Sequence, residues 1–157
     1  MSTEEPNSAE QPEPEGDEES PLDRDAGDPN LSVLVRIANT GAMTMGVTLL
    51  VGGAVVSGLL VGSIEYFESL ASRLEEEGGE GGQALADVYR TQAGEFREQM
   101  PSDFDEAFGA PYVATFIHLK NAHVFSPSGA YIPKNQGTHW RGRLDSVDAW
   151  SIGSITT

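Results

Sequence analysis

Residues 116–155 read FIHLKNAHVFSPSGAYIPKNQGTHWRGRLDSVDAWSIGSI, and this stretch decides the fold. Apolar and polar side chains alternate through much of it, which is the pattern of strands with one buried face. In this pattern Trp140 and Leu144 fall on one face, and Arg141 and Arg143 fall on the other. The stretch therefore predicts β-structure in which the two arginines share an outward face.

Four strands are expected in this part of the chain: Val113–Leu119, Ala122–Phe125, Thr138–Asp145 and Ala149–Ile155. Lys120 and Asn121 separate the first two strands as a turn or a bulge, and residues 126–137 form a longer loop.

A hairpin is expected upstream, because two β-prone runs, residues 45–51 and 54–61, flank the pair Gly52 and Gly53. Both glycines accept the positive φ angles of a tight turn. The apolar run at residues 47–62 is about 16 residues long, whereas a membrane-spanning helix needs about 20. We therefore expect a buried hairpin and no membrane span.

Three helices complete the expected pattern. The first begins with Asp28 as N-cap and Pro29 at its first position, ends at Gly41 and buries a stripe of apolar residues: Leu31, Leu34, Val35 and Ala38. The second is capped by Ser63 and ended by the run EEEGGEGG at residues 75–82. The third covers residues 83–99 and is carried by four apolar side chains: Leu85, Val88, Tyr89 and Phe96.

The fold class is therefore α+β, with a helical insertion at about residues 63–100 of a single domain over residues 28–157. An N-terminal helix followed by about five short, bent strands resembles a small Sm-like or SH3-like antiparallel barrel. A bent antiparallel sheet covered by helices satisfies the same pattern.

The charge is concentrated at the N-terminus. Of the 25 acidic and nine basic residues, 11 acidic and one basic lie within residues 1–30. Residues 1–27 contain almost no large apolar side chain, and we expect them to form a disordered acidic tail. The net charge of −16, with few lysines and no cysteine, favours a cytoplasmic protein of a halophilic organism. The N-terminus shows no signal peptide.

Candidate catalytic and metal-binding groups are sparse. The three histidines, His118, His123 and His139, lack the spacing of a metal motif, and no cysteine is available as ligand or nucleophile. Ser126 and Ser128 lack the context of a nucleophile elbow. Asp145 and Asp148 fit turn bonding better than acid–base chemistry. We expect no enzyme, no cofactor and no metal.

One basic concentration remains, formed by Arg141 and Arg143 with Lys120 and Lys134 nearby, and tryptophans adjoin it. With an Sm-like fold it predicts an oligonucleotide-binding module that uses phosphate contacts and stacking. The overall acidity makes nucleic acid an unfavourable ligand, because phosphate binding weakens steeply with salt. A protein partner fits the arginines better.

Two segments carry a resemblance to a known family. VTLLVGGAVVSGLLVGSIEYFESL, from Val47 to Leu70, and the stretch from Phe116 to Ile155 together resemble the gas vesicle accessory protein GvpU family, in the order found there. The phrases FIHLKN and WRGRLDSVD are its most specific parts. The acidic tail and acidic helical region depart from the family pattern, and the overall composition suggests a haloarchaeal-type member.

The resemblance implies a non-catalytic protein that takes part in vesicle organisation or clustering and does not build the shell wall. Its partners would be gas vesicle shell or accessory proteins, with self-association as a further possibility, and it would lie in the cytoplasm on gas vesicles. We expect partner binding at six residues: Trp140, Arg141, Arg143, Asp145, Lys120 and Asn121. The Sm-like oligonucleotide-binding module is the alternative.

Overall fold

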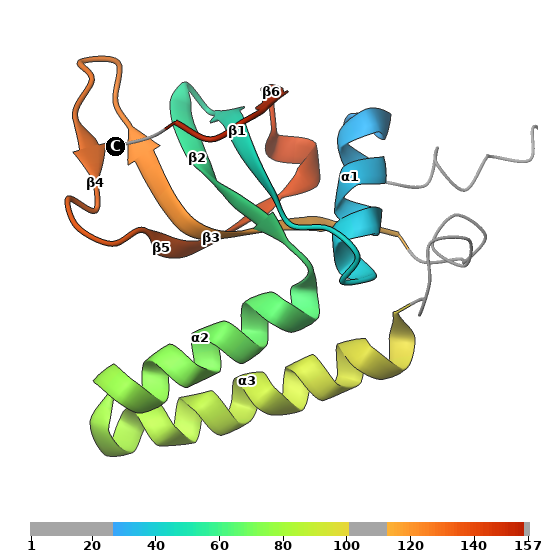
Figure 1. The fold of residues 1–157 in the computed structure, drawn as a ribbon, viewed down its shortest axis with the longest axis vertical. Coiled ribbons are helices and arrows are strands. Elements are labelled where there is room, and N and C mark those ends of the chain that lie inside the picture. The colour runs from blue at the N-terminus through green and yellow to red at the C-terminus, as the bar shows by residue number, and fades with distance from the viewer. Residues whose placement is uncertain (1–26, 101–112, 156–157) are drawn as a thin grey trace, which may run out of the picture.

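A computed structural model describes residues 27–100 and 113–155. Within these ranges the fold is α+β, with three α-helices and six antiparallel strands (Figure 1). The elements follow the order α1 (Pro29–Asn39), β1 (Met45–Val51), β2 (Ala54–Val61), α2 (Ser63–Glu77), α3 (Gly79–Gln99), β3 (Phe116–Phe125), β4 (Tyr131–Ile132), β5 (Thr138–Arg143), the 3-10 turn η1 (Leu144–Ser146) and β6 (Ala149–Ile152). The expected disordered tail lies outside the described residues, apart from Gly27.

The strands form one open sheet in the order β4-β3-β2-β1-β6, and β5 also pairs with β3. Because β2 occupies one edge of β3, both β4 and β5 lie along the other edge. The expected barrel is therefore wrong, and the alternative, a helix-covered sheet, is the fold. α1 packs on the face of the sheet that would line the inside of a barrel, in the place of the opposite barrel wall. β5 and β6 therefore do not pair with each other.

The glycine hairpin is confirmed. Gly52 and Gly53 have φ angles of +56° and +83° and connect β1 to β2, whose register pairs Val51 with Ala54. β3 is one strand, where two were expected. Its register shifts between Leu119 and Ala122, because Asn121 adopts a φ of +51° and forms a bulge.

One strand was not expected, and three strand boundaries differ from expectation. The first of these boundaries is the start of β3, which lies at Phe116 and not at Val113. β4 was missed because a strand of only two residues shows no alternation, and it pairs with the end of β3. The strand expected to reach Asp145 ends at Arg143, where η1 buries Leu144 completely and redirects the chain. β6 then returns to pair with β1, and it ends at Ile152.

The chain after β6 crosses the sheet face opposite α1. Gly153 accepts a hydrogen bond from the Thr48 hydroxyl at 2.8 Å, and the Ile155 amide donates to Ser57 Oγ at 2.7 Å. These two contacts, on β1 and β2, hold residues 153–155 against the sheet (Figure 1).

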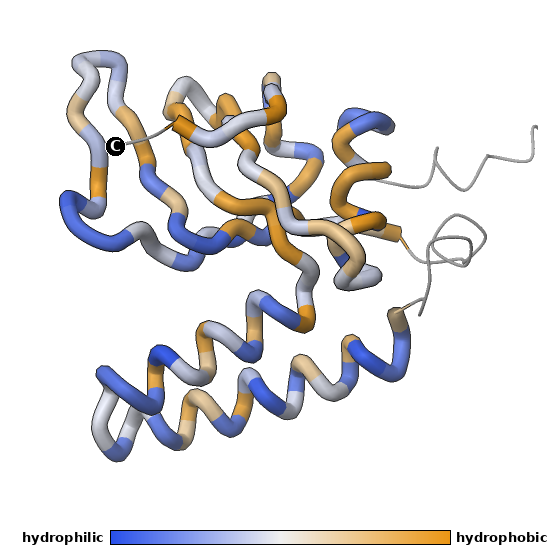
Figure 2. Tube along the Cα trace, in the orientation of Figure 1, coloured by the Kyte–Doolittle hydropathy of each residue, from blue (hydrophilic) through white to orange (hydrophobic). Residues whose placement is uncertain are grey.

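The main core lies between α1 and the sheet. Asp28 caps α1 by accepting hydrogen bonds from the amides of residues 30 and 31, as expected. The buried side of α1 is largely the expected stripe, although Leu34 is only partly buried. Arg36 is also buried, at 1% exposure, which the apolar pattern did not indicate. Figure 2 shows apolar residues recurring along α1, β1 and β2, and a more mixed pattern along α2 and α3.

A close junction joins α1 to α2. Ser63 was expected to cap α2, but it is the first helical residue, and Gly62 precedes it. The capping group comes from α1, because Asn39 Oδ1 accepts hydrogen bonds from the Ser63 amide at 2.9 Å and the Ser63 hydroxyl at 3.1 Å. A Cβ atom on Gly62 would lie 2.5 Å from the Ala38 carbonyl oxygen. This junction fixes where the helical hairpin α2–α3 leaves the sheet.

The helical hairpin turns more tightly than expected, since α3 begins at Gly79 directly after α2. Leu85 and Val88, expected in its core, are 42% and 59% exposed. The other two, Tyr89 and Phe96, are packed as expected and stack on Phe67 of α2. Small residues complete the contact: Gly82, Ala86 and Ala93 are buried. Apolar type alone could not reveal that two closely packed helices select small residues at their contact.

Replacing Gly62 by alanine tests this junction. We expect Gly62→Ala to lower the free energy of unfolding by about 1–3 kcal/mol, because the new methyl group would overlap the Ala38 carbonyl. The matched control is Gly94→Ala inside α3, where a Cβ meets no atom within 4 Å and alanine should stabilise by about 0.5–1 kcal/mol. Urea unfolding measures both. Equal effects of the two substitutions would contradict the close junction.

Candidate functional site

The register of β5 on β3 separates two sets of side chains. Arg141 pairs with His118 and Arg143 with Phe116, so these four residues share the face toward α2–α3. Trp140 pairs with Leu119 and packs, partly buried, against the core on the α1 side. The alternation therefore placed the arginines on one face and Trp140 on the other correctly.

The outer part of this face carries ion pairs. Arg143 Nε donates to Asp145 Oδ1 at 2.9 Å, and its second contact to Oδ2 makes the pair bidentate. The arginine holds the pKa of the Asp145 carboxyl below its usual value. Lys120 Nζ lies 2.9 Å from Glu65 Oε1 of α2, and Asn121 follows it in the exposed bulge.

Arg141 is exposed, as expected, but its guanidinium also contacts aromatic rings and an imidazole, which the alternating pattern did not indicate. Its guanidinium carbon lies 3.5 Å from the centre of the Phe116 ring and 5.9 Å from that of Phe67 on α2. Its Nε donates to His118 Nε2 at 3.2 Å. The guanidinium therefore lies beside the space between the sheet and the helical hairpin, although the residue as a whole is exposed to solvent.

His118 contacts Arg141 from the buried side of the site. It is 2% exposed, lies against Tyr66 and Phe67 of α2, and places Nδ1 3.4 Å from Ser63 Oγ. Burial, with a further contribution from Arg141, lowers the pKa of His118 to about 3. Because Nε2 accepts from Arg141, the neutral ring carries its proton on Nδ1, facing Ser63.

The other two histidines lie elsewhere. His139 Nε2 is 2.7 Å from Ser69 Oγ, which ties β5 to α2, and its buried Nδ1 has no hydrogen-bond partner. His123 lies beside Tyr131 at the other end of β3. Across residues 27–100 and 113–155, no three metal-ligating side chains come together.

Lys134, expected beside the arginines, stacks over the Tyr131 ring at 4.3 Å, at the β4 end of the sheet. The basic concentration in the sequence is therefore divided among separate sites. Asp148 accepts a hydrogen bond from the Gly52 amide at 2.8 Å and so braces the β1–β2 turn. Ser126 and Ser128 bond to each other within the β3–β4 loop.

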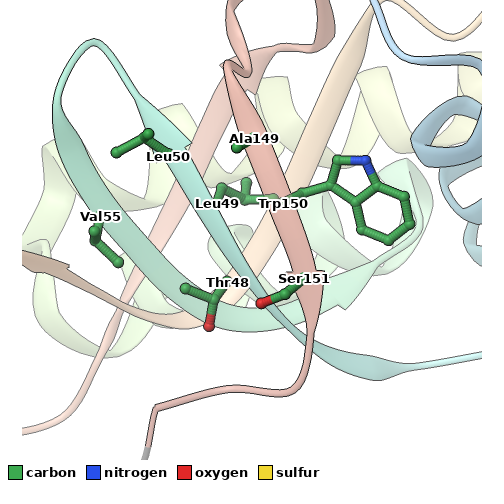
Figure 3. Close-up of a pocket in the computed structure, with 7 residues that line it drawn as sticks. All are labelled: Thr48, Leu49, Leu50, Val55, Ala149, Trp150 and Ser151. Carbon is green, nitrogen blue, oxygen red and sulfur yellow. The ribbon is translucent and has the colours of Figure 1, made fainter.

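Several hollows adjoin the described sheet. Those of about 380 and 320 Å³ lie beside β4, and two smaller ones are similar to each other in size. The first lies at β1, β2 and β6 and is about 220 Å³ (Figure 3). Figure 3 shows the Trp150 indole pointing away from Leu50 and Val55, and none of the residues that line this hollow is ionisable. The second, about 230 Å³, contains Arg141 and is lined by these residues: Ser63, Phe96, Val113, Thr115, Phe116, His118 and Arg141. Sequence reasoning missed it, because its walls come from β3, β5 and both long helices.

Comparison with known protein families gives one match, to the family described as gas vesicle protein GvpU-like, over residues 28–155. The chain belongs to this GvpU-like family. The match runs from the N-cap of α1 to the segment that crosses the sheet, so it includes every described helix and strand of the GvpU-like fold. No curated protein and no solved structure gave a match. Among the described helices, none has the length and apolar character needed to span a bilayer.

The burial of His118 predicts a pH dependence of stability. Its folded pKa of about 3 lies below the ordinary value of 6.5, so between these values the unfolded chain binds a proton that the folded chain does not. The free energy of unfolding should therefore fall as the pH drops below 6.5, with His118 contributing up to about 1.4 kcal/mol per pH unit. Urea titrations at pH 7, 6, 5 and 4 measure this, and His118→Gln should fall less steeply than the parent. Parallel curves would show that His118 is not held neutral.

Proposed function

We propose that this GvpU-like protein is a non-catalytic accessory protein that organises or clusters gas vesicles by binding another vesicle protein. The family match over residues 28–155 carries the proposal. The proposal is also supported by the side chains considered for catalysis. In the described residues, these hydroxyl, carboxylate and imidazole groups form hydrogen bonds within turns, to neighbouring strands or to arginine. Their distribution over the fold favours binding over chemistry.

The binding surface that we propose is the outer ridge of β3, β5 and η1. It combines the bidentate pair of Arg143 and Asp145 with Lys120 and the bulge at Asn121, all on or near the sheet edge. At such an edge, the paired donors of an arginine guanidinium and the oxygens of a carboxylate can bind complementary polar groups of a protein partner. Trp140 supports the strand from its core side, and we assign it no partner contact.

The shell protein and the other accessory proteins of the vesicle are the proposed partners, and self-association through the same ridge would also cluster vesicles. From this proposal we expect the protein to lie in the cytoplasm, bound to gas vesicles. The halophilic origin stays a prediction from composition. The oligonucleotide alternative has no support, because the sheet is open and the cations proposed to hold phosphate are paired or dispersed.

Co-flotation with isolated gas vesicles at high salt tests the ridge. We expect Arg143→Glu to reduce the protein recovered with floating vesicles by about 5- to 30-fold, which corresponds to a loss of about 1–2 kcal/mol, because it breaks the pair with Asp145 and reverses one charge. Arg90→Glu is the matched control, since Arg90 is also an exposed arginine paired with a carboxylate, but lies on α3. Both variants are first checked by circular dichroism.

Undiminished flotation of folded Arg143→Glu would reject the ridge as the contact surface. Failure of the parent protein to float with vesicles of its own source would reject vesicle binding altogether.

A further inference from the structure

Arg141, like Lys134, differs from most of the described basic side chains of this acidic protein, because its described contacts include no carboxylate. Five cations in the described part of the chain form ion pairs with carboxylates: Arg73, Arg90, Arg97, Lys120 and Arg143. For Arg141 the described contacts are two aromatic rings and a neutral imidazole, and none is an anion. With acidic residues so abundant, an arginine that is held away from all of them is unusual.

The guanidinium of Arg141 is fixed in place. Phe116 stacks on it at 3.5 Å. The His118 ring accepts a hydrogen bond from the arginine Nε–H group and itself contacts Ser63 and Tyr66. His118 adds no positive charge, because its pKa of about 3 keeps it neutral near pH 7. Since Nε is occupied, the two terminal amino groups remain as donors. Little side-chain entropy would be lost when they bind a ligand.

The space beside this guanidinium is a cavity of about 230 Å³ with two kinds of wall. Thr115 contributes a hydroxyl group, whereas the Ser63 hydroxyl already donates to Asn39. Ser63 is the first residue of α2, where the helix dipole favours a negative group. Phe96, Val113 and Phe116 form an apolar side. The cavity therefore suits a small anion that carries a short apolar stem.

We propose that this cavity is a binding site for a single carboxylate on a short aliphatic stem, with Arg141 as its anchor. One guanidinium and one neutral hydroxyl match a charge of −1, and the two terminal amino groups of the planar guanidinium match the two oxygens of a carboxylate. The group could belong to a free short-chain acid or to a glutamate side chain of another protein. The inference goes beyond the proposed function, because it concerns a different residue, and binding can be measured without vesicles.

Titration of the parent protein with sodium propionate tests the site, at constant high sodium chloride and constant pH. Nitrogen–proton correlation spectra report the Arg141 Nε–H group and the amides of Ser63, Thr115 and His118. We expect these signals to shift saturably in the millimolar range. Affinity should rise about three- to fourfold from acetate to propionate, because one methylene is buried. Propionamide, which has the same shape and no charge, should not bind.

Two substitutions on the same strand distinguish the anchor from general charge. Arg141→Gln should abolish the saturable shifts, and Arg141→Lys, which keeps the charge and the fold, should weaken binding about tenfold or more because it loses the fork. Arg143→Gln is the matched control and should bind propionate as the parent does. Thermal midpoints measured for each variant confirm that it is folded.

Titration with a blocked tripeptide, acetyl-Ala-Glu-Ala-amide, distinguishes a protein glutamate from a free short-chain acid as the source of the carboxylate. Tighter binding of the peptide than of propionate would identify a protein glutamate as the ligand, and weaker binding would identify a free acid; both outcomes support the site. Three results would overturn it: no saturable shift, equal binding of propionamide, or tighter binding of inorganic phosphate. Because vesicles are absent, these outcomes are independent of the flotation experiment.

Discussion

The fold depends on β3, because this strand pairs with other strands along both of its edges and packs against helices on both of its faces. β2 covers one edge, and β5 and β4 share the other, on either side of the bulge at Asn121. Ile117 and Leu119 point into the core under α1, while Phe116 and His118 point toward the helical hairpin. A strand enclosed in this way has little exposed surface, and its one exposed residue is Asn121 at the bulge. The two layers of the protein are therefore coupled through it.

The sequence predicted local features well, because each has a local cause. Two adjacent glycines specify the hairpin turn, and an aspartate before a proline specifies the start of α1. Alternation around Arg141 predicted its strand face correctly. The pattern could not predict which side chains surround Arg141 on that face, because they belong to α2 and β3, which are distant in the chain.

Several of the errors share one physical origin, which is packing between separate elements that the pattern within one segment does not describe. Leu85 and Val88 were expected inside because they are apolar, yet the narrow spacing of α2 and α3 admits alanine there instead. The cap of α2 comes from Asn39, 24 residues away from Ser63. The arginine cavity was missed for the same reason, because no single segment contains its walls.

β6 pairs with β1, although about 100 residues separate them, as in the pair of Leu50 and Ala149. During synthesis, β1 and β2 leave the ribosome long before β6, so the outer edge of β1 is without its partner while the two long helices are made. An unpaired edge can recruit strands of other chains. The rate at which residues 149–152 arrive therefore influences how much newly made protein reaches the native state, independently of its final stability.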